Sequence, residues 1–338
     1  MSAEHVPARD VQEHPQDGRL AGIARRTGTT IGREYGVHVA LLVLIIVFWF
    51  WAPNFGTQSN LLLILQQVSV VGMIAIGQTF VILTAGIDLS VGSLLAVAGL
   101  FSVLYAQREI APGNVALAFL LPILAAVLCG ALNGVLVAYA KLNPLIVTLG
   151  ALTAFRGFAI WFHIDPIYQL HDYYRYVGVK DIGPIPIQVI VYLGLAFVGG
   201  IVLTRMRFGR EIYAIGGNEE AARAAGINVA RVKMMVYVIS GFCVGIAAIV
   251  YTARLGAAEA NAAPDFNLQS IAAVVIGGTS LFGGRGKLQN TIVGTLIIGV
   301  LFNALVLLSV SSPIQEMIIG GIIIGAVWLD TLLQKGLR

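Results

Sequence analysis

The sequence is poor in charge and in cysteine. Charged residues make up 11% of its 338 residues and hydrophobic residues 58%, and the mean hydropathy is +0.86. A soluble domain of this length needs more charge to cover its surface, so the composition indicates an integral membrane protein. The two cysteines, Cys129 and Cys243, both lie inside apolar runs. Neither a disulfide framework nor a metal site is therefore indicated.

The sequence also lacks a nucleotide-binding loop. The glycine-rich stretch GGTSLFGGRGK, residues 277–287, comes nearest to the pattern G-x-x-x-x-G-K-[ST]. With Gly286 and Lys287 as the GK pair, Leu281 stands where the first glycine belongs and Leu288 where the hydroxyl belongs. We therefore expect a turn on the cytoplasmic side, with Arg285 and Lys287 near lipid head groups.

Groups for catalysis are equally scarce. The five histidines fall in the N-terminal tail or near the ends of apolar runs, so no nucleophile–base pair is expected within the bilayer. The net charge of +4 follows membrane sides and is not gathered in one domain, which gives no reason to expect a nucleic-acid partner. We predict a non-catalytic chain without a bound cofactor or metal.

Long apolar runs dominate the rest of the sequence. They do not alternate with polar residues as barrel strands do, and they are long enough for membrane-spanning helices. The prediction is an all-α integral membrane protein, with a flexible tail over residues 1–36 and a transmembrane domain over residues 37–338. Its bundle has about ten transmembrane helices, at residues 37–52, 61–84, 91–106, 115–138, 145–162, 187–203, 234–252, 268–282, 291–308 and 314–333. The stretch 268–282 is short and broken by glycines, and whether it crosses fully or re-enters stays open.

The basic residues fix the orientation. With the N-terminus inside, the inner segments hold 16 of the 21 Lys and Arg residues and the outer loops hold four. Cytoplasmic loops are the ones enriched in Lys and Arg. Both termini and the polar stretch 204–233 are therefore predicted to be cytoplasmic.

The stretch 204–233 carries six basic and three acidic residues and no long apolar run. Within it Asn218 suits a helix N-cap, Glu219 and Glu220 suit the first turn, and Gly226 suits a left-handed helix end. A surface helix of about eight residues with mostly alanine faces is expected. Such a helix either receives another protein or is a solvated connector.

Several polar side chains lie inside apolar runs. Such groups are default candidates for a transport path because burial in lipid is unfavourable for them. The candidates are Gln78, Asn133, Arg156 and Asn303. Arg156 could instead pair with a carboxylate or extend to the membrane surface.

A helix break is predicted at AGIDLSVGS, residues 85–93, through Gly86, Asp88, Ser90 and Gly92. Asp88, with Ser90 close by, is expected to cap the helix that follows.

Three glycine pairs have the spacing that lets membrane helices approach closely. They support a tight bundle more than any particular dimer face: Gly130/Gly134, Gly241/Gly245 and Gly321/Gly325.

Four ordered blocks resemble the permease subunit of bacterial ABC importers for monosaccharides, of the ribose, xylose and arabinose type. They are GQTFVILTAGIDLSVGS (77–93), NPLIVTLGALTAFRG (143–157), GREIYAIGGNEEAARAAGINV (209–229) and IAAVVIGGTSLFGGRG (271–286). The resemblance covers nearly everything after the tail. It implies a homodimer or paired permease in the bacterial inner membrane, in contact with lipids. A periplasmic binding protein would deliver the sugar, and separate cytoplasmic ATPase subunits would bind and hydrolyse the ATP.

The resemblance also implies a docking site for the ATPase. Glu220-Ala221-Ala222 followed by Gly226 is similar to the start of the EAA loop of ABC importers, although the later Ile-x-Leu-Pro is absent. The residues assigned to this coupling helix are Asn218, Glu219, Glu220, Ala221, Ala222, Arg223 and Gly226. A charge introduced at Ala222 is expected to uncouple ATP hydrolysis from uptake in a folded protein.

One departure and two rival functions remain. Before IAAVVIGG the sugar permeases typically carry acidic residues, where this chain has Asn267 and Gln269, so the sugar stays open. A related permease for branched-chain amino acids or nucleosides is one rival. A secondary carrier or channel is the other, and it would need ionisable groups deep in the membrane.

Overall fold

The structure is a computed structural model that describes residues 35–107 and 114–335. Nearly all of its regular structure is helical, as the apolar runs predict. A first helix, Tyr35–Trp51, precedes the labelled elements. These are α2 (Gln58–Leu83), α3 (Val91–Ala106), α4 (Val115–Ala138), α5 (Pro144–Phe162), α6 (Asp172–Val179), β1 (Asp181–Ile182), β2 (Ile185–Pro186), α7 (Ile187–Arg205), α8 (Arg207–Gly217), α9 (Glu219–Ala224), α10 (Val229–Leu255), α11 (Phe266–Ile276), α12 (Leu288–Leu307) and α13 (Ser312–Lys335).

Among the described residues six helices are long and apolar enough to cross a membrane: α2, α4, α5, α7, α10 and α12. Four apolar stretches of helix are shorter by the same measure: Tyr35–Trp51, Val91–Ala106, Phe266–Ile276 and Ser312–Gly325. The chain is thus a helical membrane protein. The described part of the first helix, Tyr35–Trp51, covers the predicted span 37–52 except for its last residue.

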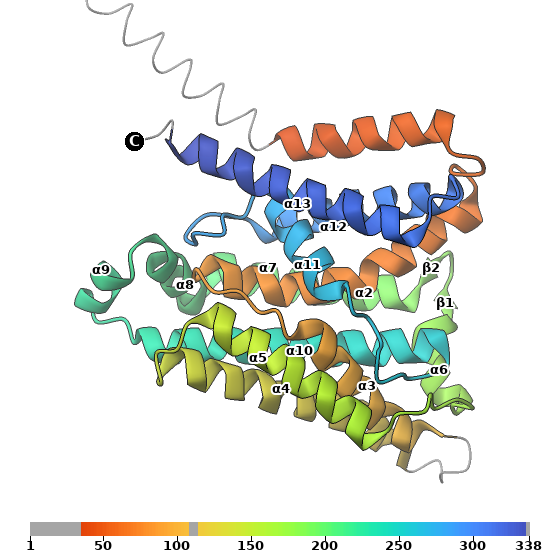
Figure 1. Cartoon of the computed structure of the whole chain (residues 1–338), viewed down its shortest axis with the longest axis horizontal. Helices are drawn as coiled ribbons and strands as arrows, with labels where there is room; N and C mark the ends of the chain where they lie inside the picture. The colour runs from red at the N-terminus through yellow and green to blue at the C-terminus, as the bar shows by residue number, and fades with distance from the viewer. Residues whose placement is uncertain (1–34, 108–113, 336–338) are drawn as a thin grey trace, which may run out of the picture.

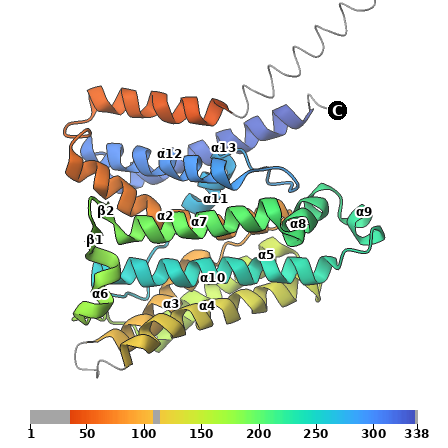
Figure 2. The same cartoon turned by 180° about the vertical axis from the view of Figure 1, so that it is seen from behind.

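Long helix α10 organises one half of the bundle, packing against α4, α2 and α3, while α12 packs against α11 and α2. Figures 1 and 2 show the first helix, α12 and α13 along one side of the molecule, α2, α7 and α11 in the middle, and α3, α4, α5 and α10 along the other side. Short helices α8 and α9 lie at one end of the bundle, and α6 with the β1–β2 hairpin lies at the opposite end. These ends are called the α9 end and the α6 end below.

Two of the predicted glycine pairs form the contact between α4 and α10. A Cβ built on Gly241 would lie 2.3 Å from the carbonyl oxygen of Ala126, and one built on Gly130 would lie 2.4 Å from the carbonyl oxygen of Tyr237. The backbones of the two helices therefore touch directly. Gly321 of the third pair has no atom within 4 Å of such a Cβ, so it takes no part in this packing.

At the α6 end, helix α6 is tied to the bundle by Tyr174. Helix α6 lies between the predicted spans 145–162 and 187–203, and a helix there was not predicted. The Tyr174 hydroxyl is fully buried, 2.7 Å from the Ser102 hydroxyl of α3 and 2.5 Å from the Thr252 hydroxyl of α10.

The predicted span 268–282 is not one helix. Helix α11 has 11 residues, which at about 1.5 Å per residue covers roughly half of a hydrocarbon core of about 30 Å. Residues 256–265 before it and 277–287 after it are not helical. Non-helical backbone is tolerated at membrane depth only where protein or a cavity surrounds it. Glycines and a proline around the apolar run stop the helix early.

Candidate coupling surface and transport path

Helix α9 is built by the residues that the sequence assigned to it. The Asn218 side chain accepts a hydrogen bond from the Ala221 N–H at 2.9 Å, so Asn218 is the N-cap as predicted. Gly226 has φ of +82°, and the N–H groups of Gly226 and Ile227 donate to the carbonyls of Arg223 and Ala222. This pattern is a Schellman motif. The helix is six residues long, shorter than the eight expected.

Glu219 fastens α9 to α10. Its carboxylate accepts from the Arg223 guanidinium at 3.0 Å on the same helix and from the Lys233 ammonium at 2.5 Å on α10. The hydrogen bond from Lys233 is the main reason that the pKa of Glu219 lies below its usual value. The first turn of α9 is thus connected to the start of a long helix that runs through the bundle.

The two faces of α9 differ. Ala222 is buried, with 4% of its surface exposed, and belongs to the main hydrophobic core. Glu220, Ala221, Arg223 and Ala224 are exposed. The expectation that a charge at Ala222 leaves the protein folded is therefore wrong, because that charge would be buried in the core. The surface open to a partner is the opposite one, around Ala221 and Ala224.

Asp88 is the centre of a buried polar network in the helix break between α2 and α3. One carboxylate oxygen accepts from the Ser90 N–H at 3.0 Å and the Ser90 hydroxyl at 2.6 Å, and the other accepts from the Ser240 hydroxyl of α10 at 3.2 Å. The Asn133 amide of α4 donates to the Ser90 hydroxyl at 2.9 Å. The Gln78 amide of α2 donates to the Asp88 carbonyl. The network joins three helices to the break.

The N-cap of α3 is Ser90, and Asp88 stands two residues before it. Asp88 accepts one backbone N–H at the start of the helix, which is the interaction predicted for it, although the cap position itself belongs to Ser90.

Gly86 and Gly92 lack side chains, which lets Tyr237 and the backbone at Ala263 approach the helix break closely. A Cβ on Gly86 would lie 3.0 Å from the Tyr237 hydroxyl. A Cβ on Gly92 would lie 2.7 Å from the carbonyl oxygen of Ala263, in the non-helical segment before α11. The Asn267 amide also donates to the Leu89 carbonyl at 3.5 Å. Each non-helical segment, 84–90 or 256–265, therefore contacts the first turn of the helix that follows the other segment.

Arg156 of α5 binds the second of these segments. Its guanidinium donates from Nη1 to the Ala260 carbonyl at 2.6 Å, and from Nη1 and Nη2 to the Ala262 carbonyl at 3.1 Å. A segment that leaves the helix exposes carbonyls without helical partners, and Arg156 satisfies two of them. Within the described part of the chain Arg156 forms no ion pair with a carboxylate, which was one of the alternatives for this residue, and backbone carbonyls hold it instead.

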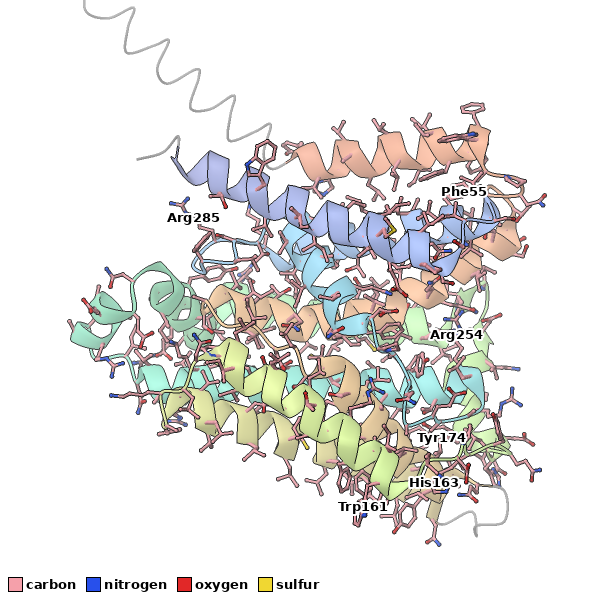
Figure 3. The ribbon with its side chains drawn as sticks, in the orientation of Figure 1. Phe55, Trp161, His163, Tyr174, Arg254 and Arg285 are labelled. Carbon is pink, nitrogen blue, oxygen red and sulfur yellow. The ribbon has the colours of Figure 1, made fainter. Side chains whose placement is uncertain are left out.

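Asn303 of α12 lies apart from the other path candidates. It forms a two-way amide pair with Asn60 at the start of α2, with N–O distances of 2.9 and 2.8 Å. The Asn60 amide also donates to the Phe55 carbonyl at 2.9 Å, and Figure 3 shows Phe55 toward the α6 end. The four predicted path residues thus occupy three places: Gln78 and Asn133 at the Asp88 network, Arg156 at segment 256–265, and Asn303 near Phe55.

Sequence reasoning missed Ser240 and the carbonyl partners of Arg156. A single serine in the apolar run of α10 has no spacing that connects it to residue 88, and carbonyls carry no sequence signal. Helix α8 was also missed, although its buried Ile212 and Ile215 are three residues apart, which is a helical spacing.

Comparison with known proteins bears on what these elements do. Residues 60–327 match the family described as the branched-chain amino acid transport system / permease component. The chain belongs to this permease family. The match includes the helix break, the stretch 204–233 and the turn 277–287.

Individual relatives of this permease are similar along almost their whole length. It is 40% identical to the D-allose transport system permease protein AlsC of Escherichia coli K12 over 309 residues, covering 89% of this chain and 93% of the relative. It is 40% identical to the ribose import permease protein RbsC of Bacillus subtilis 168, covering 88% and 92%. It is 30% identical to the xylose transport system permease protein XylH of Escherichia coli K12, covering 95% and 96%. No solved structure matches this permease.

Proposed function

We propose that the chain is the membrane-spanning permease subunit of an ATP-driven ABC importer that carries a monosaccharide across the bacterial inner membrane. The observation that carries the proposal is the identity of about 40%, over nearly the whole chain, to permeases named for allose and ribose. The subunit itself is non-catalytic and binds no cofactor. ATP is bound and hydrolysed by separate cytoplasmic chains.

The proposed topology has about ten crossings, six by long helices and the rest by shorter or broken ones, with both termini in the cytoplasm. The α9 end is the cytoplasmic side, because the stretch 204–233 and Arg285 lie there (Figure 3) and basic residues favour that side. The α6 end faces the periplasm, where exposed Tyr168, Tyr173 and Tyr176 gather. A periplasmic sugar-binding protein docks on this end.

The ATPase subunits contact the exposed face of α9. Alanine side chains there let a partner approach the helix backbone, while Ala222 and the Glu219–Lys233 pair hold the opposite face to the bundle. ATP-driven closure of the two ATPase subunits displaces α9, and the displacement switches the path between its two sides. Ala221→Glu should lower sugar uptake per ATP hydrolysed without loss of folded protein, and Ala221→Ser is the matched control. Unchanged coupling in Ala221→Glu would contradict docking at this face.

The sugar path runs between two copies of the chain. Two hollows found within the described residues have empty volumes of about 200 and 180 Å³, whereas ligand pockets usually measure about 300–1,000 Å³. Helix α5 is mostly exposed, and a Cβ on its Gly150 or Gly157 would meet no atom within 4 Å, so a second helix could approach closely. Bilayer lipids cover the remaining apolar faces.

The alternative substrates are branched-chain amino acids and nucleosides, since the family description names the former. The binding protein that docks on this permease decides between them. We expect calorimetry on that protein to show binding of a pentose or hexose from a panel of ribose, xylose, allose, leucine and adenosine. Binding of leucine or adenosine alone would overturn the sugar assignment.

A further inference from the structure

Three backbone segments far apart in the sequence touch at the α9 end. They are the last turn of α8 at Gly216, the end of α2 at Leu83, and the turn before α12 at Gly284. The Gly284 N–H donates to the Leu83 carbonyl at 2.9 Å. A Cβ on Gly216 would lie 1.9 Å from that carbonyl oxygen and 2.3 Å from the Gly284 nitrogen. Only glycine fits at position 216, because no side-chain movement can relieve contacts with backbone atoms.

The turn 277–287 supplies the other glycines of this contact. Gly283 and Gly284 have φ of +83° and +69°. A Cβ on Gly283 would lie 2.8 Å from the Ala85 nitrogen, and one on Gly284 would lie 2.8 Å from the Gly216 carbonyl carbon. The three segments, which we call the glycine junction (Leu83–Ala85, Gly216 and Gly283–Gly284), meet backbone against backbone. These contacts join backbone atoms, which cannot change rotamer to make room. A shift of one segment therefore displaces the others.

A side chain adds a second connection between the same elements. The Tyr213 hydroxyl of α8 donates to the Gly286 carbonyl at 2.9 Å, across 73 residues of sequence. Ile212 and Ile215 of α8 are buried on either side of it. Helix α8 is thus held to the turn before α12 at two points, through Tyr213 and through Gly216.

The two segments that α8 contacts border the helix break at 84–90 and the short helix α11. Residues 84–90 lead from the junction to the Asp88 network, and the turn 277–287 follows α11, whose first turn contacts the same break through Asn267 and Leu89. Helix α9 follows α8 directly, with only Asn218 between them. A displacement of α9 would therefore reach the break at 84–90 and helix α11 through the two contact points of α8, Tyr213 and Gly216.

We propose that the glycine junction transmits the movement of α9 to the helix break at 84–90 and to helix α11, with Gly216 and Tyr213 as positioning residues for transport. The proposal rests on the proposed function, in which the ATPase acts on α9. It also gives the stretch GGTSLFGGRGK a role beyond the lipid contact expected from its sequence. A junction that served only packing would affect stability without changing how many sugar molecules enter per ATP hydrolysed.

The test compares two neighbouring glycines of α8. Gly216→Ala places a methyl group against backbone, whereas a Cβ on Gly217 would meet nothing within 4 Å. The complete importer, purified by a tag on this chain and placed in proteoliposomes with its binding protein, is assayed for sugar uptake and for ATP hydrolysis. We expect Gly216→Ala to lower the ratio of uptake to hydrolysis by about tenfold. Gly217→Ala should keep the wild-type ratio, and Tyr213→Phe should give an intermediate one.

Equal ratios in Gly216→Ala and Gly217→Ala would overturn the proposal, as would uptake and hydrolysis falling in equal proportion. If Gly216→Ala does not accumulate, Tyr213→Phe serves as the test, because it removes only one oxygen atom. A wild-type ratio of uptake to hydrolysis in Tyr213→Phe would then refute the role of the junction. Ala221→Glu separates this proposal from the function on which it rests. If Ala221→Glu leaves coupling intact, α9 is not the ATPase contact; if it uncouples while Gly216→Ala does not, only the junction fails.

Discussion

The contact between α4 and α10 offers a direct test of the packing described above. In Gly241→Ala the new methyl group would lie 2.3 Å from the Ala126 carbonyl oxygen and 2.9 Å from its carbon. Overpacking of a tight contact destabilises by about 1–3 kcal/mol. Alanine in place of glycine inside a helix stabilises by about 1 kcal/mol. Because the obstructing atoms belong to the α4 backbone, we expect the upper part of the overpacking range, about 2–3 kcal/mol, and therefore a net loss of about 1–2 kcal/mol.

Gly321→Ala is the matched control, since Gly321 lies within α13 and has nothing within 4 Å of an added Cβ. Only the helix propensity then changes, and the variant should gain about 1 kcal/mol. The two variants should therefore differ by about 2–3 kcal/mol in free energy of unfolding. The assay is SDS titration of the purified protein in mixed micelles, followed by circular dichroism. Equal stability of Gly241→Ala and Gly321→Ala would refute the close approach of α4 and α10.

Three further predictions concern the polar contacts. Asp88→Asn should destabilise the same preparation by about 1–3 kcal/mol, because an amide has one acceptor oxygen where the carboxylate uses two, and wild-type stability would contradict the network. Asn303→Leu should lose about 1–3 kcal/mol because the buried side-chain oxygen of Asn60 loses its donor, and the double variant with Asn60→Leu should lose less than the two single losses combined; additive losses would argue against the pair. The stabilisation from Glu219 should be complete above its usual pKa of 4.5 and vanish as pH falls through its lowered pKa. Thermal melting at a series of pH values should therefore show a fall in melting temperature over this range that is larger in the wild type than in Glu219→Gln.

Much of the fold follows from local sequence. Apolar runs of sufficient length locate the long helices, and the bounds of α3 and α4 coincide with the predicted spans. The ends of α9 were predictable because Asn218 and Gly226 act on backbone groups within a few residues. Local rules suffice where the partner of a group is a neighbour in the chain.

The rest depends on contacts that no local rule contains. Polarity within apolar runs singled out Gln78, Asn133, Arg156 and Asn303, yet their separation into three places depends on helix packing. Their partners are often carbonyls, as at Ala260, which every residue type carries. The inward face of α9 could not be read from its three similar alanines, Ala221, Ala222 and Ala224. The glycines within 268–282 indicated a short, broken span, which α11 confirms, but its packing against α12 and α2 could not be read from the sequence.

The central claim, that this chain imports a monosaccharide with energy from ATP, is tested most directly by uptake. Cells of the host with and without the chain are supplied with radiolabelled ribose, xylose, allose, leucine or adenosine, with and without collapse of the proton gradient while ATP is maintained. The account predicts loss of uptake of one sugar when the chain is absent, recovery when the chain is restored, and persistence of that uptake when the gradient is collapsed. Loss of leucine or adenosine uptake, or sugar uptake that stops with the gradient, would contradict it.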